Sequence, residues 1–203
     1  MPVNVRSVLC AIALLLAPAC SEENAPGPQS FPPLSYSYLT HLYLNVAKIE
    51  IEDDWTPSED DVSWLSPARP LDALRRMAQD RLVAAGTSSR AVFKIQDASL
   101  RKGESVLSAH AAVELDIYTD SGTRVGFAEA RAARTTTYSP EDSSDAALRP
   151  LLYQLTKGLM DDMNVEFEYQ VRHNLKEWLQ QPSEPAGAVP PPVQAQPLQN
   201  PGM

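Results

Sequence analysis

Cysteine is almost absent from this 203-residue chain, since Cys10 and Cys20 are the only two and both precede residue 21. A disulfide framework and a catalytic Cys–His pair are therefore excluded from the rest of the chain. Histidine is also rare. His41, His110 and His173 stand far apart, with no H-E-x-x-H, no C-x-x-C and no pair four residues apart. Transition-metal sites need such spacings, so we expect no metal, no other cofactor, and three surface or strand histidines.

Motifs for nucleotide binding and for serine hydrolysis are missing as well. The chain contains no G-x-S-x-G, no P-loop and no G-x-G-x-x-G. The acidic stretch 53–61 lacks the EF-hand spacing and its turn glycine, so it predicts a solvated loop rather than a calcium site. A hydrolase with two carboxylates stays open, because its partners need not be close in sequence. Five aromatic residues are predicted either to line a ligand groove or to join the core: Tyr36, Tyr38, Tyr43, Trp55 and Trp64.

Basic residues are outnumbered, with 17 Lys and Arg against 26 Asp and Glu, which gives a net charge of −9. Binding to nucleic acid depends on clustered Lys and Arg, and so does electrostatic attachment to anionic lipid. We therefore expect no nucleic-acid partner. The acidic surface is predicted to serve solubility.

The first twenty residues have the layout of a bacterial export signal. Arg6 precedes an apolar run from Val8 to Leu16, and the small residues Ala17-Pro18-Ala19 follow it. That run is too short to span a bilayer. We therefore predict that residues 1–19 are a signal peptide. Its removal would leave 16 basic and 26 acidic residues, a net charge of −10.

Leu16-Ala17-Pro18-Ala19-Cys20 resembles the lipobox of bacterial lipoproteins, whose cysteine receives acyl chains such as palmitate. Its leucine stands one place early, and Pro18 is unusual there. Ordinary cleavage after Ala19 is the alternative, but it would leave an unpaired N-terminal thiol in an oxidising compartment. We therefore predict lipidation at Cys20. Ser21 resembles the residue that follows the cysteine in lipoproteins sent to the outer membrane. We therefore expect the protein to be anchored on the periplasmic side of that membrane, with a soluble periplasmic or secreted protein as the alternative.

Two proline-rich ends are predicted to bracket one domain. Residues 20–34 form the anchor cysteine and its tether, and residues 181–203 form a disordered tail rich in Pro and Gln. The span 35–180 has the size of a single domain. We expect an α+β fold with about four strands in a mostly antiparallel sheet. A helix should follow the first strand, and a C-terminal helix or helix pair should pack on the sheet.

The first half of the domain predicts a strand and then a helix. Apolar residues alternate over 39–52 but change phase near Ala47, which favours a β-bulge there. Pro70–Ala85 carries one apolar stripe, with Pro70 suited to the first turn and Gly86 expected as the C-terminal stop. Strands are then predicted around 91–96 and 113–118.

A hairpin is expected at Asp120-Ser121-Gly122, with Gly122 in the left-handed conformation. A three-residue loop would place Ile117 opposite Val125 and Leu115 opposite Phe127. Residues 127–134 have helix propensity, but their continuation from a hairpin and the following Thr135-Thr136-Thr137 favour a strand.

The C-terminal helical region opens near Ser139-Pro140 and contains Pro150, which predicts a kink or a late start. Its apolar residues form two stripes about 130° apart at 100° per residue. We therefore expect a break or bend between Gly158 and Asn164, or a second half that packs elsewhere. The two stripes are Leu148, Leu152, Leu155 and Leu159, and Phe167, Val171, Leu175 and Trp178.

The predicted element order behind an acceptor-like cysteine resembles that of small bacterial envelope lipoproteins. These include the lipopolysaccharide-assembly lipoprotein of the outer membrane and the auxiliary lipoproteins of ABC-type lipid transporters. The runs 70–74, 80–86 and 95–100 also look like those of uncharacterised alphaproteobacterial lipoproteins. The resemblance implies no catalytic residues.

This resemblance implies a non-enzymatic accessory to assembly or transport of an outer-membrane component, with the membrane and an envelope protein as partners. A periplasmic module that binds a lipid or other apolar ligand is the alternative, and a hydrolase with an unrecognised carboxylate site is third. An apolar cavity between the C-terminal helices and the sheet would favour the module. A filled core with an exposed apolar face or edge would favour the accessory.

Replacing Cys20 by Ala is expected to move the protein from the membrane fraction to the soluble periplasm. Buried acyl chains contribute about 0.8 kcal/mol per CH₂, and the acidic domain offers no substitute for them. Fractionation of cells that express wild type and variant at equal levels measures this. A variant that stays with the membrane would overturn the prediction of lipidation.

Overall fold

A computed structural model describes residues 30–180. Over that range the chain forms two α-helices and two β-sheets, which confirms the α+β class. The elements are β1 (Leu42–Leu44), β2 (Lys48–Glu52), α1 (Pro70–Arg81), β3 (Leu82–Ala84), β4 (Arg90–Lys102), β5 (Val106–Tyr118), β6 (Arg124–Thr137), α2 (Asp145–Asn174) and β7 (Leu179–Gln180). Short 3₁₀ turns cover Ser63–Leu65, Pro140–Asp142 and Lys176–Trp178. The predicted signal peptide and tail, and most of the tether, lie outside the described residues.

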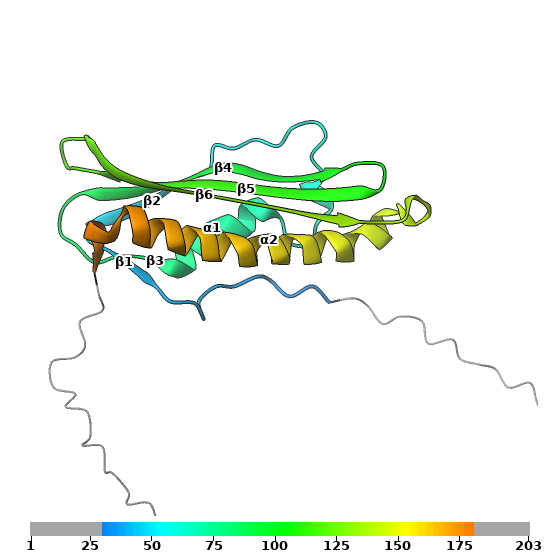
Figure 1. The fold of residues 1–203 in the computed structure, drawn as a ribbon, viewed down its shortest axis with the longest axis horizontal. Coiled ribbons are helices and arrows are strands. Elements are labelled where there is room, and N and C mark those ends of the chain that lie inside the picture. Colours follow the sequence, from blue (N-terminus) through cyan, green and yellow to red (C-terminus); the bar gives the residue numbers. More distant parts are fainter. Residues whose placement is uncertain (1–29, 181–203) are drawn as a thin grey trace, which may run out of the picture. The chain divides into compact units, whose positions relative to one another are not determined.

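The larger sheet has the order β2-β4-β5-β6. β4, β5 and β6 pair antiparallel, while β2 pairs parallel with β4, so the prediction of a four-stranded, mostly antiparallel sheet is confirmed. α1 and α2 lie side by side on one face of this sheet (Figure 1). The space between helices and sheet is filled by buried apolar side chains from all of these layers.

A second sheet, which the sequence did not predict, has the order β3-β1-β7. The predicted single strand over 39–52 is wrong, because β1 belongs to this small sheet and β2 to the large one. Between them the backbone turns, and the amide of Ala47 donates to the carbonyls of Ser88 and Ser89, both at 3.0 Å. The phase change in the apolar pattern therefore marks a passage from one sheet to another, not a bulge.

Helix α1 begins at Pro70 as predicted, with Asp72 in its first turn. It ends at Arg81 rather than at Ala85, because residues 82–84 pair with β1 as strand β3. Gly86 is not the helix stop. Its amide donates to the carbonyl of Val46 at 2.9 Å, and a Cβ on it would lie 2.6 Å from the backbone carbon of Asn45. Close approach of two backbone segments requires the glycine here.

The hairpin between β5 and β6 has the predicted loop, and Gly122 has a φ of 85°. The predicted register is wrong. Ile117 lies opposite Gly126 and Leu115 opposite Ala128, because the pairing shifts by one residue next to Tyr118. A β-bulge therefore cancels the register that the loop length alone would set. As a result Val125 and Phe127 are 45% and 52% exposed. Residues 127–134 form a strand, as predicted.

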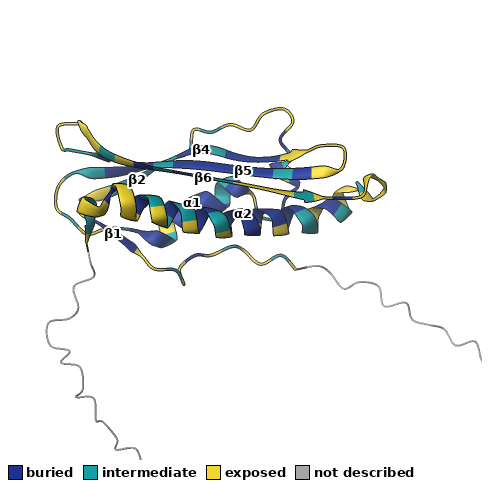
Figure 2. Ribbon diagram, in the orientation of Figure 1, coloured by how far each residue is buried: buried dark blue, intermediate teal, exposed yellow. Residues whose placement is uncertain are grey.

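Helix α2 runs unbroken for 30 residues, with Pro150 in its second turn, so the expected break is wrong. Met160 and Met163 are both buried, and they join the two predicted stripes into one band that winds round the helix. Because a β-sheet is twisted, a helix that lies on it can bury such a winding band along its whole length. The second half does not leave the sheet, since Phe167 meets Phe93 of β4 edge-on with ring centroids 5.5 Å apart. The opposite face of α2 is exposed (Figure 2).

Residues 31–35, which we call the strap, pack on the domain. The ring of Phe31 lies 5.2 Å from that of Tyr153 in α2, and the Tyr153 hydroxyl donates to the carbonyl of Pro32 at 2.9 Å. Leu34 is half-buried against the core. Packing therefore begins within the segment that the sequence assigns to the tether.

Replacing Gly86 by Ala is expected to destabilise the domain by about 1–3 kcal/mol, because the new Cβ would overlap the backbone of Asn45. Gly103→Ala is the matched control. The nearest atom to its Cβ is the carbonyl oxygen of Val106 at 3.4 Å, so this glycine should tolerate the change. Urea unfolding of both variants measures the difference, and equal stabilities would contradict the crowding at Gly86.

Candidate functional site

Cys20, the predicted lipidation site, lies outside the described residues. The three histidines are not brought together by the fold. His41 is exposed just before β1, His110 lies within β5, and His173 stacks on Tyr169 near the end of α2 with ring centroids 5.9 Å apart. Within residues 30–180 no three His, Cys, Asp or Glu side chains gather as a metal-binding group.

The acidic stretch 53–61 is a loop in which three of the carboxylates have separate partners. Asp53 pairs with Arg75 of α1, and Asp60 accepts a hydrogen bond from Ser58. Asp61 is buried and accepts from the backbone amides of Ser63 at 2.8 Å and Leu100 at 3.0 Å. The stretch therefore fastens itself to α1 and β4 rather than directing its oxygens to one point.

The five aromatic residues proposed for a groove do not share one. Tyr36 is buried in the core, and Trp55 is half-buried against it. Tyr43 is half-buried on β1. Tyr38 and Trp64 are exposed, at 74% and 70%. Only Tyr38 stands beside other exposed apolar side chains.

Two carboxylates come together on the face of the large sheet opposite the helices. Asp116 is buried and forms ion pairs with Lys94 at 2.7 Å and with Arg124 at 2.6 Å. Glu114 pairs with the same arginine at 3.2 Å. Burial and the charge of Asp116 raise the pKa of Glu114. Because Asp116 is covered and both groups are held by cations, this cluster stabilises the sheet surface and presents no free carboxylate pair.

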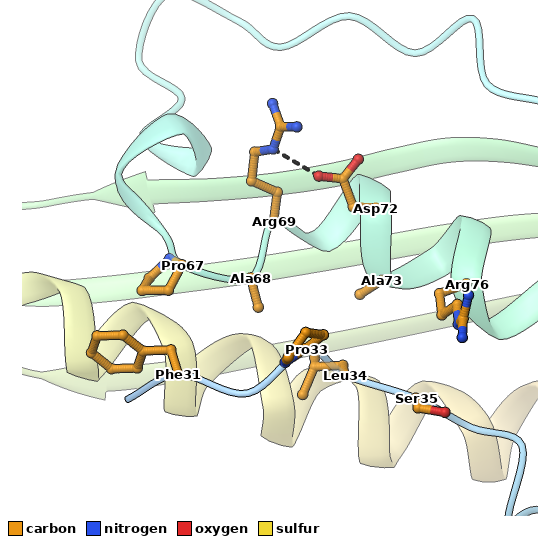
Figure 3. Close-up of a pocket in the computed structure, with 10 residues that line it drawn as sticks. All are labelled: Phe31, Pro33, Leu34, Ser35, Pro67, Ala68, Arg69, Asp72, Ala73 and Arg76. Carbon is orange, nitrogen blue, oxygen red and sulfur yellow. Dashed lines mark hydrogen bonds and ion pairs between the residues drawn. The ribbon is translucent and has the colours of Figure 1, made fainter. Parts of the chain in front are cut away.

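A groove of about 400 Å³ lies between the strap and the start of α1 (Figure 3). Its walls are mainly apolar, and Leu34, Ala68 and Ala73 line it from both sides. The charged groups beside it are already paired, Arg69 with Asp72 at 2.8 Å and Arg76 with Asp80 at 3.1 Å. The volume and lining suit a small apolar ligand. Sequence reasoning missed this groove, because it assigned one wall to the tether.

The exposed face of α2 and one residue before β1 form an apolar patch, which we call the α2 patch and define as Tyr38, Val165 and Tyr169. Their exposed fractions are 74%, 73% and 59%. Val165 and Tyr169 are one helical turn apart and so are neighbours on the helix surface. Tyr38 and Val165 line the same hollow of about 140 Å³. Isolated apolar residues at a surface are common, but large ones side by side mark contact surfaces.

The floor of this hollow is a buried arginine. Arg81 is 0% exposed, and it donates to the backbone carbonyl of Asn164 at 3.0 Å and to its side-chain oxygen at 3.1 Å. It also donates to the carbonyl of Thr40 and forms an ion pair with Glu168. These bonds join the end of α1, the middle of α2 and the residues before β1. The α2 patch therefore rests on a rigid base.

Glu168 lies between two guanidinium groups, since it also pairs with Arg172 at 2.8 Å. Burial raises the pKa of its carboxyl, but hydrogen bonds from Arg172 and Arg81 outweigh that effect, so the pKa is lowered from its ordinary value of 4.5. The charged form of Glu168 is thus favoured by the fold.

No family model and no curated protein matches the chain. Solved structures are similar to it, and two of them are lipoproteins by name. A minor lipoprotein from Acinetobacter baumannii shares 14% identity with a TM-score of 0.36, over 68% of this chain and 99% of that one. A candidate lipoprotein from Caulobacter crescentus CB15 shares 13% identity with a TM-score of 0.34, over 63% of this chain and 89% of that one. Similarity at this level assigns no family.

Replacing Glu168 by Gln is expected to reduce the stability of the domain at pH 7 and to make that stability less dependent on pH in the acidic range. A carboxyl with a lowered folded-state pKa stabilises the fold above its unfolded pKa, and this contribution is lost as the pH falls through the folded value. The difference between wild type and variant should therefore shrink between about pH 5 and pH 3. Thermal melts across that range measure it, and parallel pH profiles would rule out this role for Glu168.

Proposed function

We propose that this chain is a lipid-anchored, non-enzymatic protein of the bacterial envelope that docks on another envelope protein. It would act as an accessory in assembly or transport of an outer-membrane component. The observation that carries the proposal is the exposed α2 patch on a domain whose core is filled. Apolar side chains between α2 and the sheet occupy the place where a ligand cavity would lie.

The chemistry of the α2 patch suits a protein partner. Tyrosine is enriched at interfaces because it combines a large apolar ring with a hydrogen-bonding hydroxyl, and two of the three patch residues are tyrosines. The hollow between Tyr38 and Val165 can receive one partner side chain. Asp161 and Glu168 line the same hollow, but Lys157 and two arginines already pair with them, so a partner that offers an apolar side chain fits best.

The predicted anchor limits how far the domain can lie from the membrane. Cys20 and Phe31, the first residue of the strap, are eleven residues apart. An extended chain of that length reaches about 36–40 Å at most. A lipid at Cys20 would hold the domain close to the membrane, and a partner in the same membrane would meet the α2 patch at high effective concentration.

The placement of the polar residues supports a non-enzymatic role. The histidines lie in separate elements, and Asp116 is buried between two cations. General acid–base chemistry needs a titratable group within hydrogen-bond reach of a substrate. Neither the α2 patch nor the hollow beside it offers a carboxylate pair free of arginine.

The groove under the strap favours a second function, the binding of a small apolar ligand. It is lined from both sides by apolar side chains, and the strap that forms one wall is the segment nearest the predicted anchor. Ala68→Phe would fill this groove from a half-buried position outside the core and leave the α2 patch untouched.

Val165→Glu and Tyr169→Glu are expected to abolish complementation of a deletion strain, scored as envelope integrity, while each variant remains folded. Surface changes of this kind alter stability by about 0.5 kcal/mol or less. Gln154→Glu is the matched control, because it adds the same charge to an exposed position on α2, about three turns before Val165. His41→Ala, His110→Ala and His173→Ala should each complement.

The groove variant separates the two functions. If a folded Ala68→Phe variant fails and the patch variants complement, ligand binding replaces docking as the function. A folded, membrane-bound histidine variant that fails would instead indicate an enzyme or a metal site.

A further inference from the structure

Strand β7 brings the end of the described chain beside β1. It pairs antiparallel with β1, with Tyr43 opposite Gln180, and it is an outer strand of the order β3-β1-β7. Because the two strands run in opposite directions, the residues that follow Gln180 start out towards those that precede Leu42. The residues before Leu42 include Tyr38 of the α2 patch. β7 therefore directs residues 181–192, which we call the C-terminal segment, towards this patch.

The pairing between β7 and β1 has a chemical reason to end where it does. The amide of Asn45 donates to the carbonyl of Trp178 at 2.7 Å, and hydrogen-bonded pairs recur at every second residue of an antiparallel ladder. Two such steps further along the same register, His41 would lie opposite Pro182. Proline has no N–H to donate, so the ladder cannot continue there in the same form. Backbone pairing with β1 therefore gives way to contacts of another kind.

The composition of the C-terminal segment suits an aromatic surface. Its five prolines are Pro182, Pro185, Pro190, Pro191 and Pro192. Glu184 is its only charged residue. Sequences rich in proline favour the extended polyproline II conformation, and grooves lined with aromatic rings recognise that conformation. Exposed rings on the domain are therefore the contacts that we expect for this segment.

The surface along α2 and the residues before β7's partner strand carries such rings. Tyr38 and Tyr169 belong to the α2 patch, and the exposed ring of His173 stacks on Tyr169. His41 is exposed too, and its ring centroid lies 6.2 Å from that of Tyr43. The carboxylates that line the hollow already have basic partners. A proline-rich segment with a single charge therefore fits this surface.

The C-terminal segment is long enough to cover the α2 patch. It starts opposite Tyr43, which is five residues from Tyr38, and a chain of five residues spans at most about 18 Å. In the polyproline II conformation the first five residues of the segment span about 16 Å, so it comes level with Tyr38 near Pro185. Its remaining seven residues add about 22 Å. The two patch residues on α2 are only about 6 Å apart along the helix axis.

We propose that the C-terminal segment docks on the α2 patch in an extended conformation, with its prolines against Tyr38 and Tyr169. This inference rests on the proposed function, since it concerns what occupies the docking surface when no partner is bound. Because β7 holds the segment beside the patch, its effective concentration there is in the millimolar range. A contact too weak to form between separate molecules therefore forms within one chain.

The C-terminal segment would thus compete with the envelope partner for the α2 patch. A partner binds only those chains whose patch is free, so its apparent Kd rises as the free fraction falls. If the segment covers the patch in nine chains of ten, the apparent Kd is about tenfold higher than for a free patch. Only a partner that binds the patch better than the segment does would then dock.

A spin label on the segment tests this contact in the mature chain, residues 20–203, with Cys20→Ser as the background so that the label has one attachment point. A label at Ala188→Cys is expected to broaden the amide NMR signals of Val165 and Tyr169. The signal of Val106, at the start of β5, should keep its width. Circular dichroism and melting temperatures show that each variant is folded.

Matched variants separate docking from mere tethering. A label at Leu198→Cys, beyond the segment, should broaden the patch signals at most half as much. Pro185→Gly combined with glycine at 190–192 is expected to reduce the broadening from the label at residue 188 at least twofold, because it removes the proline rings and makes the segment flexible. Pro197→Gly with Pro201→Gly is the control and should leave the broadening unchanged.

Three results would overturn the proposal. The first is patch signals that are no broader than that of Val106, and the second is glycine variants of the segment that broaden the patch as much as wild type. The third is broadening that falls on dilution, which would show that the segment of a second copy occupies the patch.

This test and the test of the docking function fail independently. Complementation by Val165→Glu and Tyr169→Glu would refute docking on a partner, whereas the broadening measured in the unaltered patch would still establish the contact with the segment. Absent broadening, together with patch variants that fail to complement, would overturn the contact and leave the docking function in place.

Discussion

The fold depends on one buried cation. Arg81 ends helix α1, and its guanidinium is enclosed by the carbonyl of Thr40, by Asn164 and by Glu168. Burying a charge is costly unless it is paired and hydrogen-bonded, and here the partners come from two segments, the residues before β1 and helix α2. The chain must therefore bring the end of α1, the start of β1 and the middle of α2 to one place. β3 follows Arg81 directly, so the same bonds set β3 beside β1.

Much of the large sheet could be predicted from the sequence, because its strands alternate regularly and Gly122 marks the loop. The register of β6 could not be predicted. The loop length sets one register and the bulge shifts it by one residue, and only the packing of the sheet against the helices determines which register forms. The end of α1 was missed for a related reason. Residues 82–84 have helix propensity, but pairing with β1 outweighs it.

Of the candidate functional features, one could be predicted from the sequence and one could not. Cys20 and its surroundings could be recognised from local pattern alone, because an export signal is a linear feature. The α2 patch could not, since Val165 and Tyr169 look like core residues in the sequence. They are exposed because the buried band winds round α2 and leaves them outside it, and the band became visible only once Met160 and Met163 were placed.

The strap can be attached to the domain or detached from it, and this changes the residue at which the tether meets the domain. While the ring of Phe31 stays against Tyr153 and the carbonyl of Pro32 accepts a hydrogen bond from the Tyr153 hydroxyl, the first attached residue, Phe31, lies eleven residues after Cys20, the predicted lipidation site. The contacts that hold the strap are few beside the filled core. A pull on the domain would therefore detach the strap before it disturbed the sheet, and the next attachment would be Tyr36, whose ring is buried and whose amide donates to Asp80 of α1 at 2.7 Å. With the proposed lipid on Cys20, the domain would thus have two possible distances from the membrane, and mechanical load would select between them.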